Sequence, residues 1–330
     1  MVEPYLFFIA GPPVGEEFGN LGIKIIFLIF HPLINPRQRY RLPSTFEIRH
    51  CISLYNSSVL HFSFFISLLF PLVNSLYLRN VYTLKKSLGQ HFLKDENVCH
   101  KIVQALQEHP FQRLLEVGPG GGALTKYLLQ LPDIEFKCVE VDDEKVTWLL
   151  KTYPTLQSKI IHQDFLTIDQ PYSEPFTVVG NFPYNISSQI LFKVLEWKGS
   201  VQVVVGMFQK EVAQRVAARE GNKVYGILSV LVQAFFDVEY LFEVSENAFN
   251  PPPKVKSAVI RLTPRQSIPE MKSERSFFVL VKTAFNQRRK TLRNAVKSLY
   301  TPEALQDPIF DKRAEQLTVN DFARLTFSMK

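Results

Sequence analysis

The sequence predicts an α/β fold, with a Rossmann-like seven-stranded sheet followed by a small helical domain. Apolar runs of strand length alternate with helical segments between residues 113 and 264, as in a parallel sheet covered by helices. Glycines follow the first run at Gly118 and Gly120, and acidic residues close the next runs. After Pro264 the sequence becomes basic and helical, which indicates the second domain.

Length and composition limit the classes of protein. The chain has 330 residues, 46% of them hydrophobic and 21% charged, so it can bury a sizeable core and is expected to form two domains. Lys and Arg outnumber Asp and Glu by 38 to 31, which favours an anionic partner such as nucleic acid. Three scattered cysteines, Cys51, Cys99 and Cys138, are too few for a disulfide framework or a zinc cluster. We therefore expect a cytoplasmic protein without a metal site.

Residues 1–80 differ from the rest of the chain. They hold ten of the 28 phenylalanines and four acidic residues, and they show no regular periodicity. The segment Val59–Leu78 is apolar but interrupted by polar residues and Pro71, so no stable membrane association is expected. Glu3 and Pro4 stand where the basic region of a signal peptide belongs. We interpret residues 1–80 as an atypical extension that is disordered or not translated, with Val81 as a candidate start.

The first domain is expected to span residues 81–264. Strands are expected at Arg113–Val117, Phe136–Val141, Ile160–Asp164, Thr177–Asn181, Val201–Gln209, Leu228–Phe236, Glu239–Val244 and Ala258–Leu262. Helices are expected from the glycine turn to about Leu131, at Ile186–Leu195 and at Glu211–Arg219. We interpret the set as one seven-stranded sheet with helices between its strands, although the eight ranges are one more than such a sheet requires.

The turn Gly118-Pro119-Gly120 is a candidate nucleotide-binding turn. Its glycines let the backbone approach a ligand closely, and the amides that open the next helix present a positive dipole end. Glu140 follows about twenty residues later, and this spacing also fits a dinucleotide-binding turn. The glycines alone therefore do not decide between cofactors.

Three carboxylates favour S-adenosylmethionine over a nicotinamide dinucleotide. Glu116, two residues before the first glycine, can orient an ammonium group and would repel a pyrophosphate. Glu140 ends a strand and can accept hydrogen bonds from ribose hydroxyls. Asp164 can accept from an adenine amino group, with Val141 and Phe165 as apolar surface for the ring. Ligands of open α/β sheets bind at the carboxyl ends of the strands, where all three carboxylates are expected.

The tetrapeptide Asn181-Phe182-Pro183-Tyr184 predicts chemistry on an exocyclic amine. The lone pair of such an amine is delocalised into its ring, so an enzyme must hold the nitrogen with acceptors and stack the ring flat. Asn181 can supply one acceptor and Tyr184 the stacking face, while Pro183 makes the turn rigid. We expect these four residues to be the catalytic ones.

Eight segments resemble the ribosomal RNA adenine dimethyltransferase family, and its small-subunit enzymes in particular, over about residues 84–325. They are Lys85–Leu93, Glu116–Gly120, Glu140–Asp142, Gln163–Asp164, Gly180–Asn185, Gln209–Val212, Ala248–Ser257 and Ala284–Asn294. The resemblance implies that Lys85–Leu93 folds over the cofactor. It also implies methyl transfer from S-adenosylmethionine to N6 of two adjacent adenosines near the 3′ end of small-subunit rRNA, with a role in small-subunit biogenesis.

The resemblance implies roles for individual residues. Tyr184 and Phe249 are implied to sandwich the target adenine. His91 stands where many relatives have asparagine, so a backbone contact is expected there rather than a side-chain contact. Phe182 replaces the proline or leucine of relatives, but its carbonyl, the second acceptor for N6, is unaffected. The implied cofactor contacts come from His91, Leu93, Gly118, Glu140, Asp164 and Asn181.

Residues 265–330 are expected to form a helical, basic RNA-binding domain. Its leading helix is expected at Phe277–Tyr300, and a further turn and helix at Arg313–Leu325. A run of basic residues without acidic neighbours can follow phosphate oxygens. That run holds Arg288, Arg289, Lys290, Arg293 and Lys297, and Lys254, Lys256 and Arg261 are candidates to extend its surface.

Two other functions stay open on the sequence alone. A ribosome-assembly factor would bind RNA without transferring a methyl group, although the intact Asn181 and Tyr184 favour an enzyme. A large-subunit rRNA adenine methyltransferase of the antibiotic-resistance type is nearer, but the basic run Phe285–Thr291 favours the small-subunit enzymes. The expected partner is small-subunit rRNA within the pre-30S particle, and the expected state is a monomer.

Overall fold

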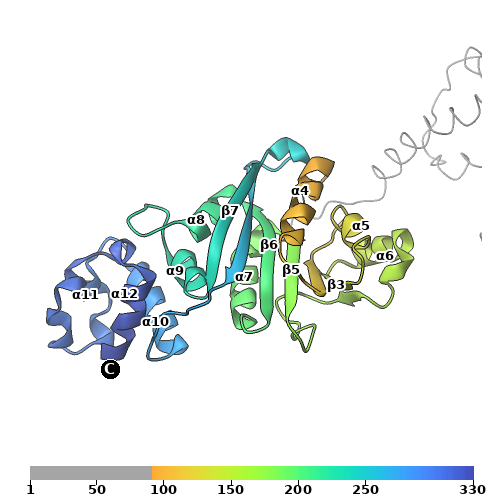
Figure 1. The fold of residues 1–330 in the computed structure, drawn as a ribbon. Helices are drawn as coiled ribbons and strands as arrows, with labels where there is room; N and C mark the ends of the chain where they lie inside the picture. Colours follow the sequence, from red (N-terminus) through yellow and green to blue (C-terminus); the bar gives the residue numbers. More distant parts are fainter. Residues whose placement is uncertain (1–90) are drawn as a thin grey trace, which may run out of the picture. The chain divides into compact units, whose positions relative to one another are not determined.

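The computed structural model describes residues 91–330 (Figure 1). The predicted N-terminal extension, the apolar segment Val59–Leu78 and the candidate start at Val81 lie outside these residues. The strands are β1 (Phe92–Leu93), β2 (Arg113–Val117), β3 (Glu135–Glu140), β4 (Ile160–His162), β5 (Phe176–Asn181), β6 (Val201–Gln209), β7 (Phe236–Val244), β8 (Phe249–Asn250) and β9 (Ser257–Pro264). The helices are α4 (Glu96–Gln107), α5 (Thr125–Leu128), α6 (Asp143–Thr152), α7 (Ser187–Glu196), α8 (Lys210–Ala217), α9 (Ile227–Gln233), α10 (Glu274–Asn286), α11 (Leu292–Ala295) and α12 (Val319–Leu325). Within residues 91–330, no helix is long and apolar enough to cross a membrane.

Seven strands form one sheet in the order β4-β3-β2-β5-β6-β9-β7. The strands from β4 to β6 are parallel, and β9 runs antiparallel between β6 and β7. A separate antiparallel pair joins β1 to β8, with Leu93 opposite Phe249. The predicted seven-stranded α/β sheet is therefore confirmed.

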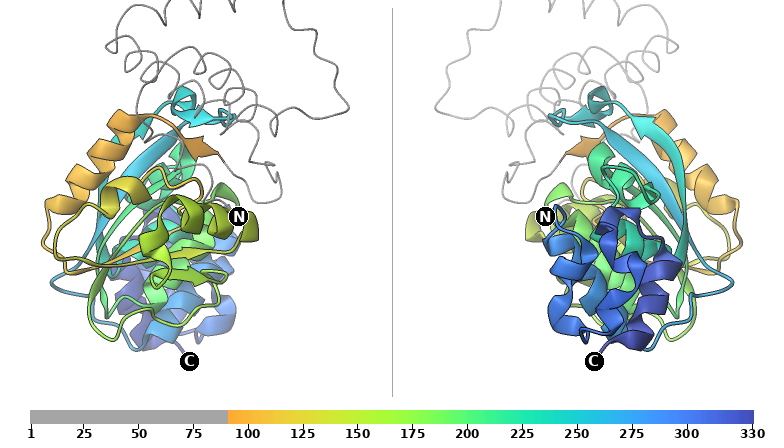
Figure 2. Two further views of the ribbon diagram at one scale, coloured as in Figure 1. Left: turned by 90° about the vertical axis from the view of Figure 1, so that its right-hand side faces the viewer. Right: turned by 90° about the vertical axis from the view of Figure 1, so that its left-hand side faces the viewer.

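Side chains of the central strands alternate between two cores. Leu115 and Val178 face a core that includes α7, α8, α9 and the C-terminal helices. Their neighbours Leu114 and Val179 face a second core with α4, α5 and α6. Helices thus cover both faces of the sheet (Figure 2), which explains why its strands are apolar throughout rather than alternating.

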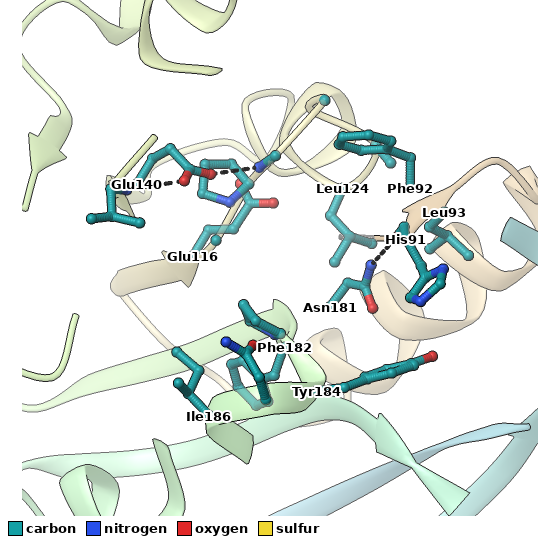
Figure 3. A pocket seen from close by; sticks show the side chains of 18 of the residues that line it. His91, Phe92, Leu93, Glu116, Leu124, Glu140, Asn181, Phe182, Tyr184 and Ile186 are labelled. Atoms are coloured by element: carbon teal, nitrogen blue, oxygen red, sulfur yellow. Dashed lines mark hydrogen bonds between the residues drawn. The ribbon is translucent and has the colours of Figure 1, made fainter. Parts of the chain in front are cut away.

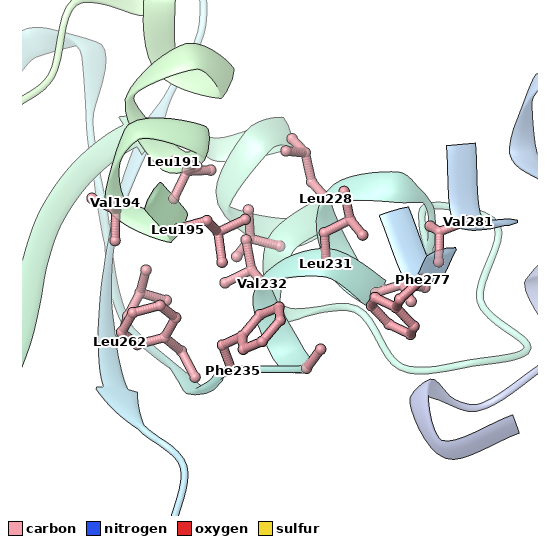
Figure 4. Close-up of a cluster of buried hydrophobic side chains, with 14 of the residues drawn as sticks. Leu191, Val194, Leu195, Leu228, Leu231, Val232, Phe235, Leu262, Phe277 and Val281 are labelled. Carbon is pink, nitrogen blue, oxygen red and sulfur yellow. The ribbon is translucent and has the colours of Figure 1, made fainter. Parts of the chain in front are cut away.

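The predicted strand at Leu228–Phe236 is wrong. Most of this run is helix α9, and β7 begins only at Phe236. Leu228, Leu231 and Val232 lie in one apolar cluster with side chains of α7 and α10 (Figure 4). A helix covered on all sides is apolar all round, so periodicity alone does not separate it from a buried strand.

The predicted helix Phe277–Tyr300 is too long. α10 begins at Glu274, where the Ser273 side chain accepts from the Ser276 amide, and ends at Asn286. A straight helix over the predicted range would be about 36 Å long. The turn after α10 instead returns Leu292 to the core that contains Leu280. The expected domain division at Pro264 stays a prediction, because the C-terminal helices share this core with α9.

Two neighbouring glycines make a hollow for the ring of Phe182. Gly180 on β5 pairs with Gly206 on β6, and Phe182 is 1% exposed. A Cβ atom on Gly180 would lie 2.7 Å from the Phe182 ring, and one on Gly206 would overlap the same ring. The glycines therefore let a large side chain anchor the turn that follows β5.

We expect Gly206→Ala to lower the free energy of unfolding by about 1–3 kcal/mol, because the added methyl overfills this hollow. Gly199→Ala is the matched control, since nothing lies within 4 Å of a Cβ there. Urea denaturation of the two variants measures the difference. Equal stabilities would show that the hollow does not constrain Phe182.

Candidate active site

A cavity of about 230 Å³ opens at the carboxyl ends of β2, β3 and β5. Liquid water occupies roughly 30 Å³ per molecule, so the cavity has room for a ligand of many atoms. From β2 the chain adds β3 and β4 on one side and β5 on the other. The cavity thus lies at the topological switch point, where open α/β sheets bind ligands. All the predicted cofactor residues line it (Figure 3): His91, Leu93, Glu116, Gly118, Gly120, Glu140, Asp164 and Asn181.

Gly118 and Gly120 shape the turn after β2. Their φ angles are +67° and +55°, a left-handed backbone that other residues rarely adopt. The Gly118 amide donates to the Val139 carbonyl at 2.9 Å. The following helix, α5, is a single turn that ends at Leu128, shorter than the predicted helix to Leu131. The backbone of the glycine turn therefore lines the cavity, and no long helix follows it to add a large dipole.

The Glu140 carboxylate holds the glycine turn in place. Its Oε2 accepts from the Gly120 amide at 3.0 Å, and its Oε1 accepts from the amides of Val141 (2.9 Å) and Asp142 (3.1 Å). A carboxylate has about four lone-pair sites, so a site remains for a hydroxyl of a ligand. The predicted ribose contact stays a prediction that this geometry permits.

Glu116 is a buried carboxyl beside the glycine turn. It is 2% exposed, and its Oε2 accepts a hydrogen bond from the Thr125 hydroxyl at 2.7 Å. Burial raises the pKa of Glu116 to about 8; the bond from Thr125 lowers this pKa and the charge of Glu140 raises it further. An ammonium group of a ligand would favour the ionised form. Ionisation of Glu116 and binding of a cationic ligand therefore favour each other.

Asp164 lies in a turn beyond β4 rather than at the end of a strand. β4 stops at His162, and Asp164 Oδ1 accepts from the Leu166 amide at 2.9 Å. Phe165 is buried and packs edge-on against Trp197, with ring centroids 5.4 Å apart. The predicted contribution of Phe165 to the cavity is wrong, because the turn directs this ring into the core. Val141, predicted for the same role, is half exposed and lines the cavity.

The backbone of His91 fixes the orientation of the Asn181 amide. Asn181 Nδ2 donates to the His91 carbonyl at 3.2 Å (Figure 3). A carbonyl has no proton to donate, so the nitrogen of the amide must face it, and Oδ1 is left as an acceptor without a hydrogen-bond partner among residues 91–330. Next in the chain, the Phe182 amide donates to the Met207 carbonyl, which anchors the backbone of the same turn to β6.

Tyr184 presents a half-buried ring at the edge of the cavity. Its hydroxyl is hydrogen-bonded to the Ser257 hydroxyl at the start of β9, and burial raises the pKa of Tyr184. Ser257 and Thr125 were not predicted as site residues. Ser257 closes the segment Ala248–Ser257, so its position at the end of a recognisable segment was the available signal.

Phe249 does not line the cavity. It is 0% exposed, pairs with Leu93 across β1 and β8, and packs in the second core. Phe249 is thus buried in the core in this structure, and the predicted sandwich of the adenine between Tyr184 and Phe249 stays a prediction. The physical reason for this burial is that β8 holds the backbone of Phe249 against β1, which leaves its ring on the core side.

Two of the five predicted RNA-binding residues form ion pairs with acidic side chains. Arg288 Nε lies 3.6 Å from Glu315 and Arg293 2.6 Å from Asp311. The sequence window held no acidic residue, but the fold brings in two from later in the chain. Three exposed residues have no ion pair within residues 91–330: Arg289, Lys290 and Lys297.

Arg261 does not extend the basic surface. It is 8% exposed, forms ion pairs with Glu108 and Glu239, and donates to the Ala105 carbonyl. Because β9 is an interior strand of the sheet, its side chains face the cores. Lys254 and Lys256, by contrast, are exposed.

The lining of the cavity is acidic. It includes Glu116, Glu140 and Asp164, and the lining residues that the structure describes include no lysine or arginine. Glu140 and Asp164 favour a cationic ligand and oppose a pyrophosphate, and Glu116 adds to this charge when an ammonium group of the ligand favours its ionised form. Residues 91–330 contain no cluster of His, Cys, Asp and Glu suited to a metal ion.

Sequence comparison identifies the family. The model of a family described as "Ribosomal RNA adenine dimethylase" matches residues 81–329. The chain belongs to the ribosomal RNA adenine dimethylase family. It is 53% identical over 246 residues to the ribosomal RNA small subunit methyltransferase A of Cytophaga hutchinsonii, an alignment that covers 73% of this chain and 95% of that protein. Its identity to the same-named protein of Porphyromonas gingivalis is 44%, over 74% of this chain and 97% of that protein.

Solved structures agree with the assignment to the ribosomal RNA adenine dimethylase family. A dimethyladenosine transferase from Plasmodium falciparum has a TM-score of 0.61 at 26% identity, covering 71% of this chain and 96% of that chain. The 23S rRNA methyltransferase ErmE has a TM-score of 0.54 at 24% identity, covering 72% and 99%, and shows the fold alone. The predicted family, fold class and enzyme class are confirmed.

We expect the free energy of unfolding to fall as pH rises from about 4.5 to 8, by about 1.4 kcal/mol per pH unit for Glu116 alone. The unfolded state loses the proton of Glu116 near its ordinary pKa, whereas the folded state keeps it to about 8. Folding therefore binds a proton in this window, and Glu116→Gln removes the dependence.

Denaturant titrations of the wild type and Glu116→Gln across this pH range measure the difference between them. Glu220→Gln, in the exposed loop between α8 and α9, is the control and is expected to follow the wild type. Parallel curves for the wild type and Glu116→Gln would show that Glu116 is ionised in the folded protein.

Proposed function

We propose that this protein transfers methyl groups from S-adenosylmethionine to N6 of two adjacent adenosines near the 3′ end of small-subunit rRNA, during small-subunit biogenesis. The fixed orientation of the Asn181 amide carries the proposal, because it presents an acceptor at the cavity edge beside an aromatic ring. The names of relatives at 50–53% identity, ribosomal RNA small subunit methyltransferase A, support the small subunit as the substrate.

The residues of the cavity fit S-adenosylmethionine. When bound, this cofactor supplies a methyl group that is already activated by a sulfonium centre. Glu116 would hold the ammonium group, Glu140 the ribose hydroxyls and Asp164 the adenine amino group. The acidic lining suits the positive charges of this cofactor, and the left-handed turn at Gly118 and Gly120 lets the backbone approach it.

The chain's own residues position the target amine. Asn181 Oδ1 and the Phe182 carbonyl accept the two hydrogens of N6, while the Tyr184 ring stacks on the base. These acceptors draw the nitrogen lone pair out of conjugation and toward the methyl group, so alignment and electrostatics provide the rate. An activated methyl group requires no strong base, so the proton lost from N6 passes to solvent. For the second transfer, the monomethyl amine must turn within the same acceptors.

We place the enzyme in the cytoplasm as a monomer that acts on the pre-30S particle. The exposed cations Arg289 and Lys290, in the turn between α10 and α11, and Lys297, just after α11, support contact with RNA phosphates. Arg288 and Arg293 contribute less to this contact, because Glu315 and Asp311 already neutralise part of their charge.

Transfer of labelled methyl groups to undermethylated small subunits, followed by mapping of the modified bases, tests the proposed function. The proposal expects two adjacent dimethyladenosines in small-subunit rRNA. Label in large-subunit rRNA would indicate the resistance-type activity instead. Binding without any transfer would indicate an assembly factor.

We expect Asn181→Ala to reduce kcat at least a hundredfold, roughly 3 kcal/mol, because it removes a preorganised acceptor for N6. The Kd of S-adenosylmethionine should change far less than kcat. Asn222→Ala removes an exposed amide whose oxygen accepts from the Val224 backbone, and it should transfer methyl at the wild-type rate. An Asn181→Ala variant with full kcat would rule out the assigned role.

We expect Arg289→Ala and Lys290→Ala each to weaken RNA binding and to lower the slope of log Kd against log salt by about 1. Arg293→Ala should have a smaller effect, because Asp311 pairs with this side chain. Filter binding of small-subunit RNA over a range of salt concentrations measures the slopes. Identical slopes for all three variants and the wild type would exclude this surface from RNA binding.

A further inference from the structure

A second hollow, of about 380 Å³, lies at the carboxyl end of β6. Its lining comes from three segments: the end of β6, the first turns of α8 and the loop before β9. The lining residues are Gln209, Lys210, Glu211, Gln214, Val255 and Lys256. We call this hollow the β6 groove. None of these residues lines the active-site cavity, so the β6 groove is a separate feature of the surface.

The β6 groove lies next to the active-site cavity along the same edge of the sheet. Asn181 on β5 is paired with Met207 on the parallel strand β6, and Gln209 stands two residues beyond Met207. With about 3.3 Å per residue along a strand and about 4.8 Å between strands, the backbones of Gln209 and Asn181 are about 8 Å apart. Ser257 is paired with Gln209 and hydrogen-bonded to the Tyr184 hydroxyl. One unstacked nucleotide can span this distance.

The β6 groove contains one lysine without an acidic partner. Lys210 forms an ion pair with Glu243 at 2.7 Å, and Glu211 forms one with Arg215 at 2.6 Å. Lys256 is exposed and has no ion pair within residues 91–330. The charges of the two ion pairs cancel, so Lys256 gives the groove a net positive charge. This charge favours an anionic ligand.

Two side-chain amides in the β6 groove are available to a ligand. Gln209 and Gln214 have no side-chain hydrogen bond to any other residue that the structure describes, and each amide has two N–H donors. The Lys210 amide donates to the Lys256 carbonyl at 2.9 Å, which joins the loop before β9 to the start of α8. The folded backbone therefore holds the amides and the lysine around one hollow.

We propose that the β6 groove binds the phosphate of the nucleotide next to the target adenosine. This inference rests on the proposed function. Lys256 supplies the cation, and Gln209 and Gln214 donate to phosphate oxygens, which only accept hydrogen bonds. A phosphate contact carries no information about the base. The groove can therefore hold the strand in two registers, one for each of the two adjacent adenosines.

Three variants separate the charge, the neutral donor and the position in the chain. Lys256→Ala removes the cation, and Gln214→Ala removes a donor without a change in charge. Lys254→Ala is the matched control, because Lys254 is an exposed lysine two residues before Lys256 that does not line the groove. We expect all three variants to keep the melting temperature of the wild type, since each side chain is exposed.

Binding of small subunits over a range of salt concentrations measures the charge contribution, and methyl transfer measures kcat and KM. We expect Lys256→Ala to lower the slope of log Kd against log salt by about 1 and to raise KM for subunits about fivefold. Gln214→Ala should raise KM about threefold without a change in slope, because a neutral donor releases no counterion. Lys254→Ala should match the wild type. The kcat and the Kd of S-adenosylmethionine should not change in any variant.

Ethylation interference locates the phosphate. Small subunits are lightly ethylated on their phosphates and separated into enzyme-bound and free fractions, and the ethylated positions are mapped on the rRNA. We expect ethylation beside the target adenosines to weaken binding of the wild-type enzyme. The same ethylation should weaken binding of Lys256→Ala less, because this variant has already lost the cation that pairs with the phosphate.

Two results would overturn the proposal. One is a salt slope for Lys256→Ala that equals that of the wild type or that of Lys254→Ala, which would leave no special role for the groove. The other is equal interference beside the target adenosines for the wild type and Lys256→Ala. Both readouts measure binding and need no methyl transfer. A wild-type enzyme that binds small subunits without methylating them would therefore refute the proposed function separately.

Discussion

The hydrogen bond from the Asn181 amide nitrogen to the His91 carbonyl is the contact on which the site depends. An amide side chain has a donor end and an acceptor end, so the bond from Nδ2 to the backbone turns Oδ1 away from the His91 carbonyl. The proposed function assigns Oδ1 to the substrate amine. This bond joins the end of β5 to the residue before β1, and β1 is in turn paired with β8. The acceptor is therefore oriented by the folded chain before any substrate arrives, as electrostatic catalysis requires.

The order of the strands explains why these groups meet. Between β2 and β5 the chain changes direction across the sheet, which leaves their carboxyl ends without a covering connection. The glycine turn after β2 and the turn at Asn181 therefore share one cavity. The paired glycines Gly180 and Gly206 anchor the second turn through Phe182, so the turn after β5 is packed as part of the sheet core.

Much of this arrangement could be predicted from residues that are close in sequence. Carboxylates such as Glu116 and Glu140 fall at the ends of apolar runs, and parallel strands bring such ends together. The Asn181–Tyr184 turn was recognisable for the same reason. Close approach of the backbone to a ligand was expected at Gly118 and Gly120, and the structure adds that both have positive φ angles.

Contacts between segments that are far apart in the sequence could not be predicted in this way. The apolar run of α9 is ambiguous because neighbours cover the helix on all sides. The fold of the C-terminal residues brings Asp311 into an ion pair with Arg293. The sequence window around Arg293, in which we counted charges, did not include Asp311. The bond between His91 and Asn181 spans 90 positions, so no local pattern in the sequence predicts it.

A structure of the enzyme with S-adenosylhomocysteine and an RNA fragment containing the target adenosines tests the central claim most directly. We expect Asn181 Oδ1 to lie about 2.7–3.2 Å from adenine N6, with Nδ2 still bound to the His91 carbonyl. An amide that is turned around, or an adenine N6 beyond hydrogen-bond distance of Asn181, would contradict it.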